Sequence, residues 1–144
     1  GLDPNPDAIL QSEVDAWVRN GDIIWHGAQT DVRPFLNDAH VFVLPSYREG
    51  TPRTVLEAMA TGRAIITTDA PGCRETVIDG HNGLLVPPRS VDMLAKAMLR
   101  LLATPDTIGD MAARSLEIVR EKYSADKVTA SMLEAMAITD EGGA

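Results

Sequence analysis

The sequence predicts an α/β domain built on a parallel sheet. Short apolar segments alternate along the chain with segments of helical periodicity. The apolar run from Val41 to Leu44 is continuous, as expected for a strand that is covered on both faces. No internal repeat or linker interrupts the 144 residues, a length that fits one domain. We therefore expect a three-layer domain over residues 1–138, followed by a disordered tail over residues 139–144.

Apolar periodicity and cap residues predict the individual elements. Helices are expected over residues 7–19, 32–39, 52–61, 91–103, 105–122 and 125–138, and strands over residues 23–25, 41–44, 64–67 and 84–86. Gly62 is expected to end the helix over residues 52–61 at its C-terminal cap. Residues 69–83 carry Pro-Gly, Asp-Gly and Asn-Gly pairs, which predict a loop-rich segment.

Composition and charge exclude several classes of protein. The net charge of −8 argues against a nucleic-acid partner, because proteins that bind nucleic acid usually carry a basic face. An acidic chain can still bind a phosphate through a local device such as the start of a helix. No apolar run approaches the roughly 20 residues of a bilayer span. Cys73 is the only cysteine, which fits a reducing cytoplasm and predicts neither a disulfide nor a zinc cluster.

The turn after the strand over residues 41–44 is the strongest candidate for a site. In open α/β sheets, ligands bind beyond the carboxyl ends of the strands. Gly50 allows unusual backbone angles, and Thr51 and Pro52 are typical of an N-cap and a first helical residue. The helix start would then present to an anion the unpaired N–H groups of Arg53, Thr54 and Val55.

Two carboxylates flank this helix start. Glu49 precedes the turn, and Glu57 follows eight positions later on the same side of the helix as Arg53. Because carboxylates repel phosphate, they are better explained by hydroxyl-rich groups beside it, such as a ribose and a sugar. Simpler interpretations remain open: Glu57 pairs with Arg53 on an exposed face, Glu49 is a solvated turn residue, and the capped helix binds nothing.

Taken together, these features resemble a known family. Residues 41–62 read V-F-V-L-P-S-Y-R-E-G-T-P-R-T-V-L-E-A-M-A-T-G, and the spacing of the two glutamates resembles the E-x(7)-E motif of the retaining GT-B glycosyltransferases of family 4. The resemblance continues through R-A-I-I-T-T-D-A-P-G-C-R-E-T-V-I-D-G-H-N-G-L-L-V-P-P and covers residues 20–103. It is greatest to bacterial enzymes that build cell-surface polysaccharide, including lipopolysaccharide, from UDP-sugars, and it implies the Rossmann-like C-terminal half of a GT-B fold.

The resemblance implies a role for each motif residue. Glu57 would bind the ribose hydroxyls, and Glu49 would be the catalytic-site glutamate that contacts donor-sugar hydroxyls near the reacting carbon. The backbone amides that hold the sugar and the diphosphate would be those of Gly50, Thr51, Arg53 and Thr54. Pro52 departs from relatives that have an N–H at this position. No metal and no other cofactor is expected, since the nucleotide-sugar is a substrate.

The resemblance also implies a partial domain. The family's basic Arg–Lys pair has no match, and Gly1-Leu2-Asp3-Pro4 resembles the loop after the domain's second strand. We therefore expect the domain's first strands and the acceptor-binding domain to be missing, an open edge at the strand over residues 41–44, self-association, and no activity in the isolated chain. A saccharide or lipid-linked acceptor would bind through the absent domain, with the parent protein cytoplasmic and peripheral at the inner membrane face.

Two other function classes were weighed. A non-catalytic nucleotide-binding module with the same fold would keep UDP binding and lack turnover. A dinucleotide oxidoreductase is disfavoured because no G-x-G-x-x-G follows any expected strand. Trp25 could stack on a uracil base or pack in a core, and its sequence context favours neither.

Overall fold

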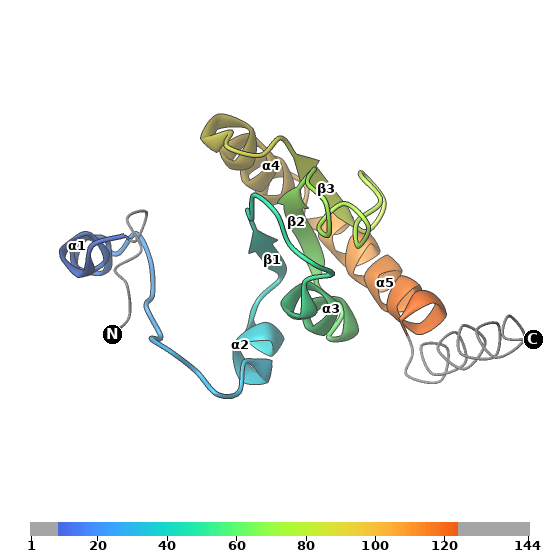
Figure 1. Ribbon diagram of the computed structural model, residues 1–144, viewed down its shortest axis with the longest axis horizontal. Coiled ribbons are helices and arrows are strands. Elements are labelled where there is room, and N and C mark those ends of the chain that lie inside the picture. Colours follow the sequence, from blue (N-terminus) through green and yellow to red (C-terminus); the bar gives the residue numbers. More distant parts are fainter. Residues whose placement is uncertain (1–8, 124–144) are drawn as a thin grey trace, which may run out of the picture. The chain divides into compact units, whose positions relative to one another are not determined.

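The computed structural model describes residues 9–123, which fall into two units that divide between Val32 and Arg33 (Figure 1). The first unit contains helix α1 (Gln11–Asn20), which ends at Gly21, and a following segment without regular structure. The helix expected over residues 125–138 and the tail over residues 139–144 lie outside the described residues, as do the first two residues of the helix expected over 7–19.

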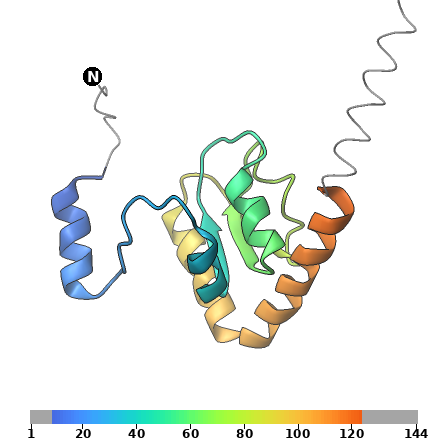
Figure 2. The ribbon, with the colours of Figure 1, turned by 90° about the horizontal axis from the view of Figure 1, so that it is seen from below.

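The second unit is a parallel α/β structure. Strands β1 (Val41–Leu44), β2 (Ala64–Thr68) and β3 (Gly83–Val86) form one sheet in the order β1-β2-β3, and both pairings are parallel. Its helices are α2 (Arg33–Asp38), α3 (Arg53–Ala60), α4 (Val91–Ala103) and α5 (Pro105–Lys122). The expected fold class is confirmed. Figure 1 shows α4 above the strands and α3 below them, and Figure 2 gives the view of the same elements from below.

Helices cover both faces of this sheet, and the alternation of side chains along β2 separates the two cores. Ile65 packs with Val55 and Met59 of α3, whereas Ile66 packs with Ala97 and Leu101 of α4. Helix α5 contributes to both cores, through Met111 to one and through Ile118 and Val119 to the other. Every residue of β2 is buried, as expected for a central strand that is covered on both faces.

The prediction of a strand over residues 23–25 is wrong. The structure has no strand there, and Ile24 is 81% exposed. Within residues 9–123, the three strands that form pair with one another, so residues 23–25 find no partner for their backbone hydrogen bonds.

Helix α3 begins one residue later than the sequence predicts. Its N-cap is Pro52, with extended backbone angles, in place of Thr51, and its first helical residue is Arg53. No side chain caps this end. At the other end the prediction is confirmed, since Gly62 has a positive φ of 69° and its N–H donates to the Met59 carbonyl.

The outer edge of β1 has no partner strand among the described residues. Beside it lies a largely apolar groove of about 380 Å³ between the sheet and helices α4 and α5. It is lined by His40, Val41, Val43, Ile66, Met98, Leu101, Leu102, Pro105 and Ile108. An unpaired strand edge beside apolar surface favours association with another chain.

The cores of the second unit predict a large difference between two isoleucines. Ile65→Ala should lower the free energy of unfolding by about 2–5 kcal/mol, because Ile65 is fully buried between the sheet and α3. Ile78→Ala is the matched control, since Ile78 is 58% exposed, and it should cost well under that. Urea denaturation followed by circular dichroism measures both, and equal losses would contradict the packing described.

The open edge of β1 predicts self-association. Sedimentation velocity of the 144-residue chain should show a sedimentation coefficient that rises with concentration, because a second copy can cover the edge and the apolar groove. A coefficient that stays at the monomer value over a hundredfold range of concentration would contradict this expectation.

Candidate functional site

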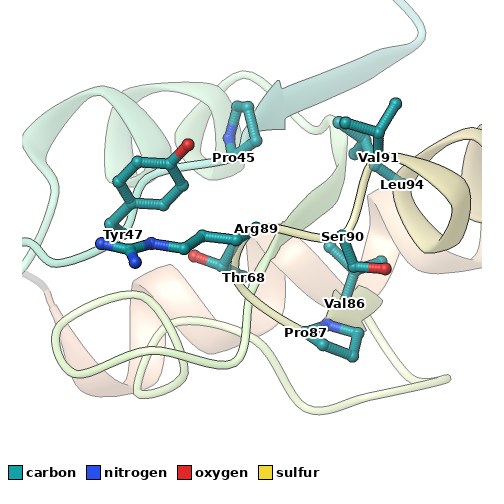
Figure 3. Close-up of a pocket in the computed structure, with 9 residues that line it drawn as sticks. All are labelled: Pro45, Tyr47, Thr68, Val86, Pro87, Arg89, Ser90, Val91 and Leu94. Carbon is teal, nitrogen blue, oxygen red and sulfur yellow. The ribbon is translucent and has the colours of Figure 1, made fainter. Parts of the chain in front are cut away.

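The loop between β1 and α3, residues 45–52, lies at the carboxyl edge of the sheet. In a parallel sheet all strands point the same way, so the residues that follow β2 and end β3 lie at this edge too. Figure 3 shows three of these strand-end residues, Pro45, Thr68 and Val86, around one cavity. The expected site therefore lies where ligands bind in open α/β sheets.

Much of the backbone of this loop has no hydrogen-bond partner within residues 9–123. The N–H groups without one include those of Ser46, Tyr47 and Arg48 as well as those of Gly50, Thr51, Arg53 and Thr54, and the last four residues are all exposed. These four are the residues whose amides the sequence assigned to the donor sugar and the diphosphate. The two on α3 stand at its first turn, where the helix dipole adds positive potential.

The expectation that the Val55 amide is also unpaired is wrong. Its N–H donates to the Pro52 carbonyl at 3.0 Å, and the Leu56 N–H reaches the same oxygen at 3.3 Å. The cause is a 3₁₀-type first turn, in which the N–H of the third helical residue, Val55, bonds to the carbonyl three positions before it. The helix start thus offers two donors, from Arg53 and Thr54, where the sequence predicted three.

Glu49 is held from two sides. The Ser46 hydroxyl donates to a Glu49 carboxylate oxygen at 2.7 Å, and the Glu49 N–H donates to the Pro71 carbonyl at 3.2 Å. Glu49 is exposed, and it directly precedes Gly50 and Thr51 in the sequence. Its remaining lone pairs can accept hydrogen bonds from hydroxyl groups of a ligand.

Glu57 forms the ion pair that the sequence left open as an alternative. The Arg53 Nε donates to a Glu57 carboxylate oxygen at 3.1 Å, one helical turn away. The Arg53 side chain is 91% exposed and that of Glu57 is 38% exposed, so water screens the pair and it contributes only a few tenths of a kcal/mol. The pair uses one acceptor position of the Glu57 carboxylate, and the other lone pairs of that carboxylate can still accept hydrogen bonds.

A cavity of about 330 Å³ lies on the α4 side of the same loop. Tyr47 lines it, with the Arg89 guanidinium 5.0 Å from the centre of the Tyr47 ring (Figure 3). None of the six expected site residues lines this cavity. The expected site is instead an exposed strip of backbone amides, which needs no deep pocket to offer its hydrogen bonds.

The contacts that hold the loop over residues 45–52 in place could not be predicted from the sequence. Pro71 and Gly72 were recognised only as a turn, although the turn packs against Glu49 and Gly50. Thr68 lies between the expected strand over residues 64–67 and the expected loop over residues 69–83, and the sequence assigned it no role, although its hydroxyl donates to the Ser46 carbonyl. A Pro-Gly pair after a buried strand is a local signal, and it carries no information about which distant loop it touches.

Residues 9–123 contain no group of three or more histidine, cysteine, aspartate or glutamate side chains placed to hold a metal ion. None of their helices is both long enough and apolar enough to span a membrane.

The fold is that of a parallel α/β domain with a candidate site at the carboxyl edge of its sheet, and comparison with known proteins identifies its family. A sequence model of the family described as Glycosyl transferases group 1 matches residues 1–104. The chain belongs to this family, whose solved relatives have the GT-B fold.

Two similar proteins illustrate the membership. An N,N'-diacetylbacillosaminyl-diphospho-undecaprenol alpha-1,3-N-acetylgalactosaminyltransferase of Campylobacter jejuni is 34% identical over 102 residues, which are 71% of this chain and 26% of that protein. The lipopolysaccharide core biosynthesis glycosyltransferase LpsE of Rhizobium meliloti is 30% identical over 118 residues, which are 82% of this chain and 35% of LpsE. The chain thus spans about a third or less of the length of these relatives.

A solved structure shares the fold. Anabaena HepE, crystallised in complex with UDP, superposes with a TM-score of 0.80 at 18% identity, over 88% of this chain and 35% of HepE. At this identity the likeness shows the fold alone. It agrees with the Rossmann-like C-terminal half of a GT-B protein that the sequence predicted.

Proposed function

We propose that this chain is the donor-binding part of a retaining glycosyltransferase. The whole protein would move a sugar from a nucleotide diphosphate sugar, with UDP as the nucleotide, to a saccharide or lipid-linked saccharide in cell-surface polysaccharide synthesis. The single observation that carries the proposal is the set of four unpartnered, exposed amides at Gly50, Thr51, Arg53 and Thr54, between the carboxylates of Glu49 and Glu57.

The amides suit a diphosphate in an acidic protein. The chain has a net charge of −8, so its overall field repels anions, and a local group of donors must overcome that repulsion. Two N–H groups at the first turn of α3 add to the positive end of its dipole, and hydrogen bonds from amides to a charged oxygen are stronger than those to a neutral one. We assign the Arg53 and Thr54 amides to the diphosphate.

The same amides would assist the reaction. When the glycosyl bond breaks, negative charge grows on the departing diphosphate, and donors that are already in place stabilise it without reorganisation. Glu49, held by the Ser46 hydroxyl, would accept hydrogen bonds from donor-sugar hydroxyls beside the Gly50 and Thr51 amides. Glu57 would accept them from the ribose, and Arg53 would keep its carboxylate in place. The two carboxylates thus orient rings and take no part as an acid–base pair.

The relatives support the class of acceptor. The Campylobacter protein is named for transfer to a diphospho-undecaprenol-linked sugar, and LpsE for lipopolysaccharide core biosynthesis. The UDP complex of HepE supports the choice of nucleotide for a protein of this fold. We place acceptor binding and turnover in the whole protein, at the inner face of the membrane, and expect the 144-residue chain to bind UDP without catalysing transfer.

The ribose role of Glu57 predicts a loss of affinity. In isothermal titration with UDP, Glu57→Ala should raise the dissociation constant at least tenfold, equivalent to about 1.4 kcal/mol, because ribose hydroxyls lose a charged acceptor. Glu117→Ala is the matched control, since Glu117 also pairs with a nearby arginine on an exposed helix face, with a separation of 3.4 Å from Arg114. The control should stay within twofold of the wild type.

Two results would count against the proposal. If Glu57→Ala bound UDP as tightly as the wild type does, the proposed ribose role of Glu57 would be wrong. A wild-type chain that fails to bind UDP would remove the donor-site assignment. Retention itself is tested by the anomeric configuration of the product that the whole protein forms, measured by NMR.

A further inference from the structure

We infer that Gly72 is a positioning residue that sets the direction of the Gly50 and Thr51 amides, an inference that rests on the proposed donor site. Gly72 lies in the turn that follows β2, more than twenty positions from these amides in the chain. It would touch no substrate. Its effect would pass through the peptide planes of the loop over residues 45–52.

The contact between the two segments is unusually close. A Cβ atom built on Gly72 would lie 2.1 Å from the Glu49 carbonyl oxygen and 2.2 Å from the Gly50 carbonyl oxygen. Real Cβ atoms essentially never come within 3.0 Å of another heavy atom. Gly72 also has a positive φ of 86°, which side-chain-bearing residues rarely adopt. Glycine is therefore required here for space as well as for backbone angle.

The same contact fixes where two N–H groups point. In a trans peptide, the carbonyl of one residue and the N–H of the next point in opposite directions, and the described chain contains no cis peptide bond. Because the Glu49 and Gly50 carbonyls face Gly72, the N–H groups of Gly50 and Thr51 face away from it. These are the amides without a protein partner that we assign to the donor sugar.

Neither segment can move aside easily. Two hydrogen bonds hold the loop over residues 45–52. The Glu49 N–H donates to the Pro71 carbonyl at 3.2 Å, and the Thr68 hydroxyl donates to the Ser46 carbonyl. The Gly72 turn is anchored by Ala70 and Cys73, both buried, which form a backbone hydrogen bond at 3.1 Å. A side chain at position 72 must therefore rotate the peptide planes between Glu49 and Thr51.

The test compares two alanine substitutions with similar backbone strain. Gly72→Ala should weaken UDP binding at least tenfold by isothermal titration and shift the Gly50 and Thr51 amide signals in ¹⁵N–¹H NMR spectra. Gly80→Ala is the matched control, because Gly80 also has a positive φ, of 74°, but has no atom within 4 Å of its Cβ position. It should bind UDP within twofold of the wild type and leave those signals in place.

The outcomes separate this inference from the proposed function. A folded Gly72→Ala variant with unchanged UDP affinity and unchanged Gly50 and Thr51 signals would overturn the inference, while UDP binding to the wild type would keep the donor site. If the wild type did not bind UDP, the proposed donor site would be wrong. The shift of the Gly50 and Thr51 amide signals in Gly72→Ala would still test whether Gly72 positions those amides.

If Gly72→Ala does not fold, amide hydrogen exchange of the wild type tests the inference instead. We expect the Glu49 amide to be protected, and the Gly50 and Thr51 amides to exchange freely without ligand and slowly with UDP. Protection of the latter two without ligand would overturn the inference, because it would mean that they point to a partner within the protein.

Discussion

Strand β2, buried along its whole length, is the constraint on which the rest of the structure depends. It pairs with β1 on one side and β3 on the other, and it separates the core under α3 from the core under α4. Its end also controls the candidate site. The Thr67 hydroxyl donates to the Leu44 carbonyl at 2.8 Å, the Thr68 hydroxyl holds Ser46, and the turn that follows supports Glu49. The burial that stabilises the sheet thus also places the loop before α3.

Much of this architecture could be predicted from local patterns. Each of the three strands contains a short apolar run, and Gly62 and Pro105 mark a helix end and a helix start, so residues 33–122 agree with prediction to within a residue or two at each boundary. The failures arise where the answer depends on partners distant in the chain. Residues 23–25 have a strand's composition but no strand to pair with. Apolar periodicity likewise does not distinguish Val91 and Leu102 of α4, which are exposed, from Ala97 and Leu101, which are buried.

The candidate site shows the same division. The motif residues follow from the helix-start pattern and from the resemblance to a known family, and the amides at the four positions that the resemblance implied have no hydrogen-bond partner among residues 9–123. What spacing could not predict is how those amides are aimed, since the direction of a peptide plane depends on what its carbonyl touches. Here the contact is Gly72, which local sequence marks only as a turn. An acidic chain can in this way offer an anion site without a cluster of basic side chains, because aligned backbone dipoles supply the positive potential.

The most direct test of the account is to map UDP onto the chain by ¹⁵N–¹H NMR chemical shifts during a titration. The account predicts that the largest shifts occur at the amides of Gly50, Thr51, Arg53 and Thr54, since UDP would become their first hydrogen-bond partner. Shifts concentrated at Tyr47, Arg89 and Val91, around the cavity on the α4 side, with those four amides unchanged, would contradict it.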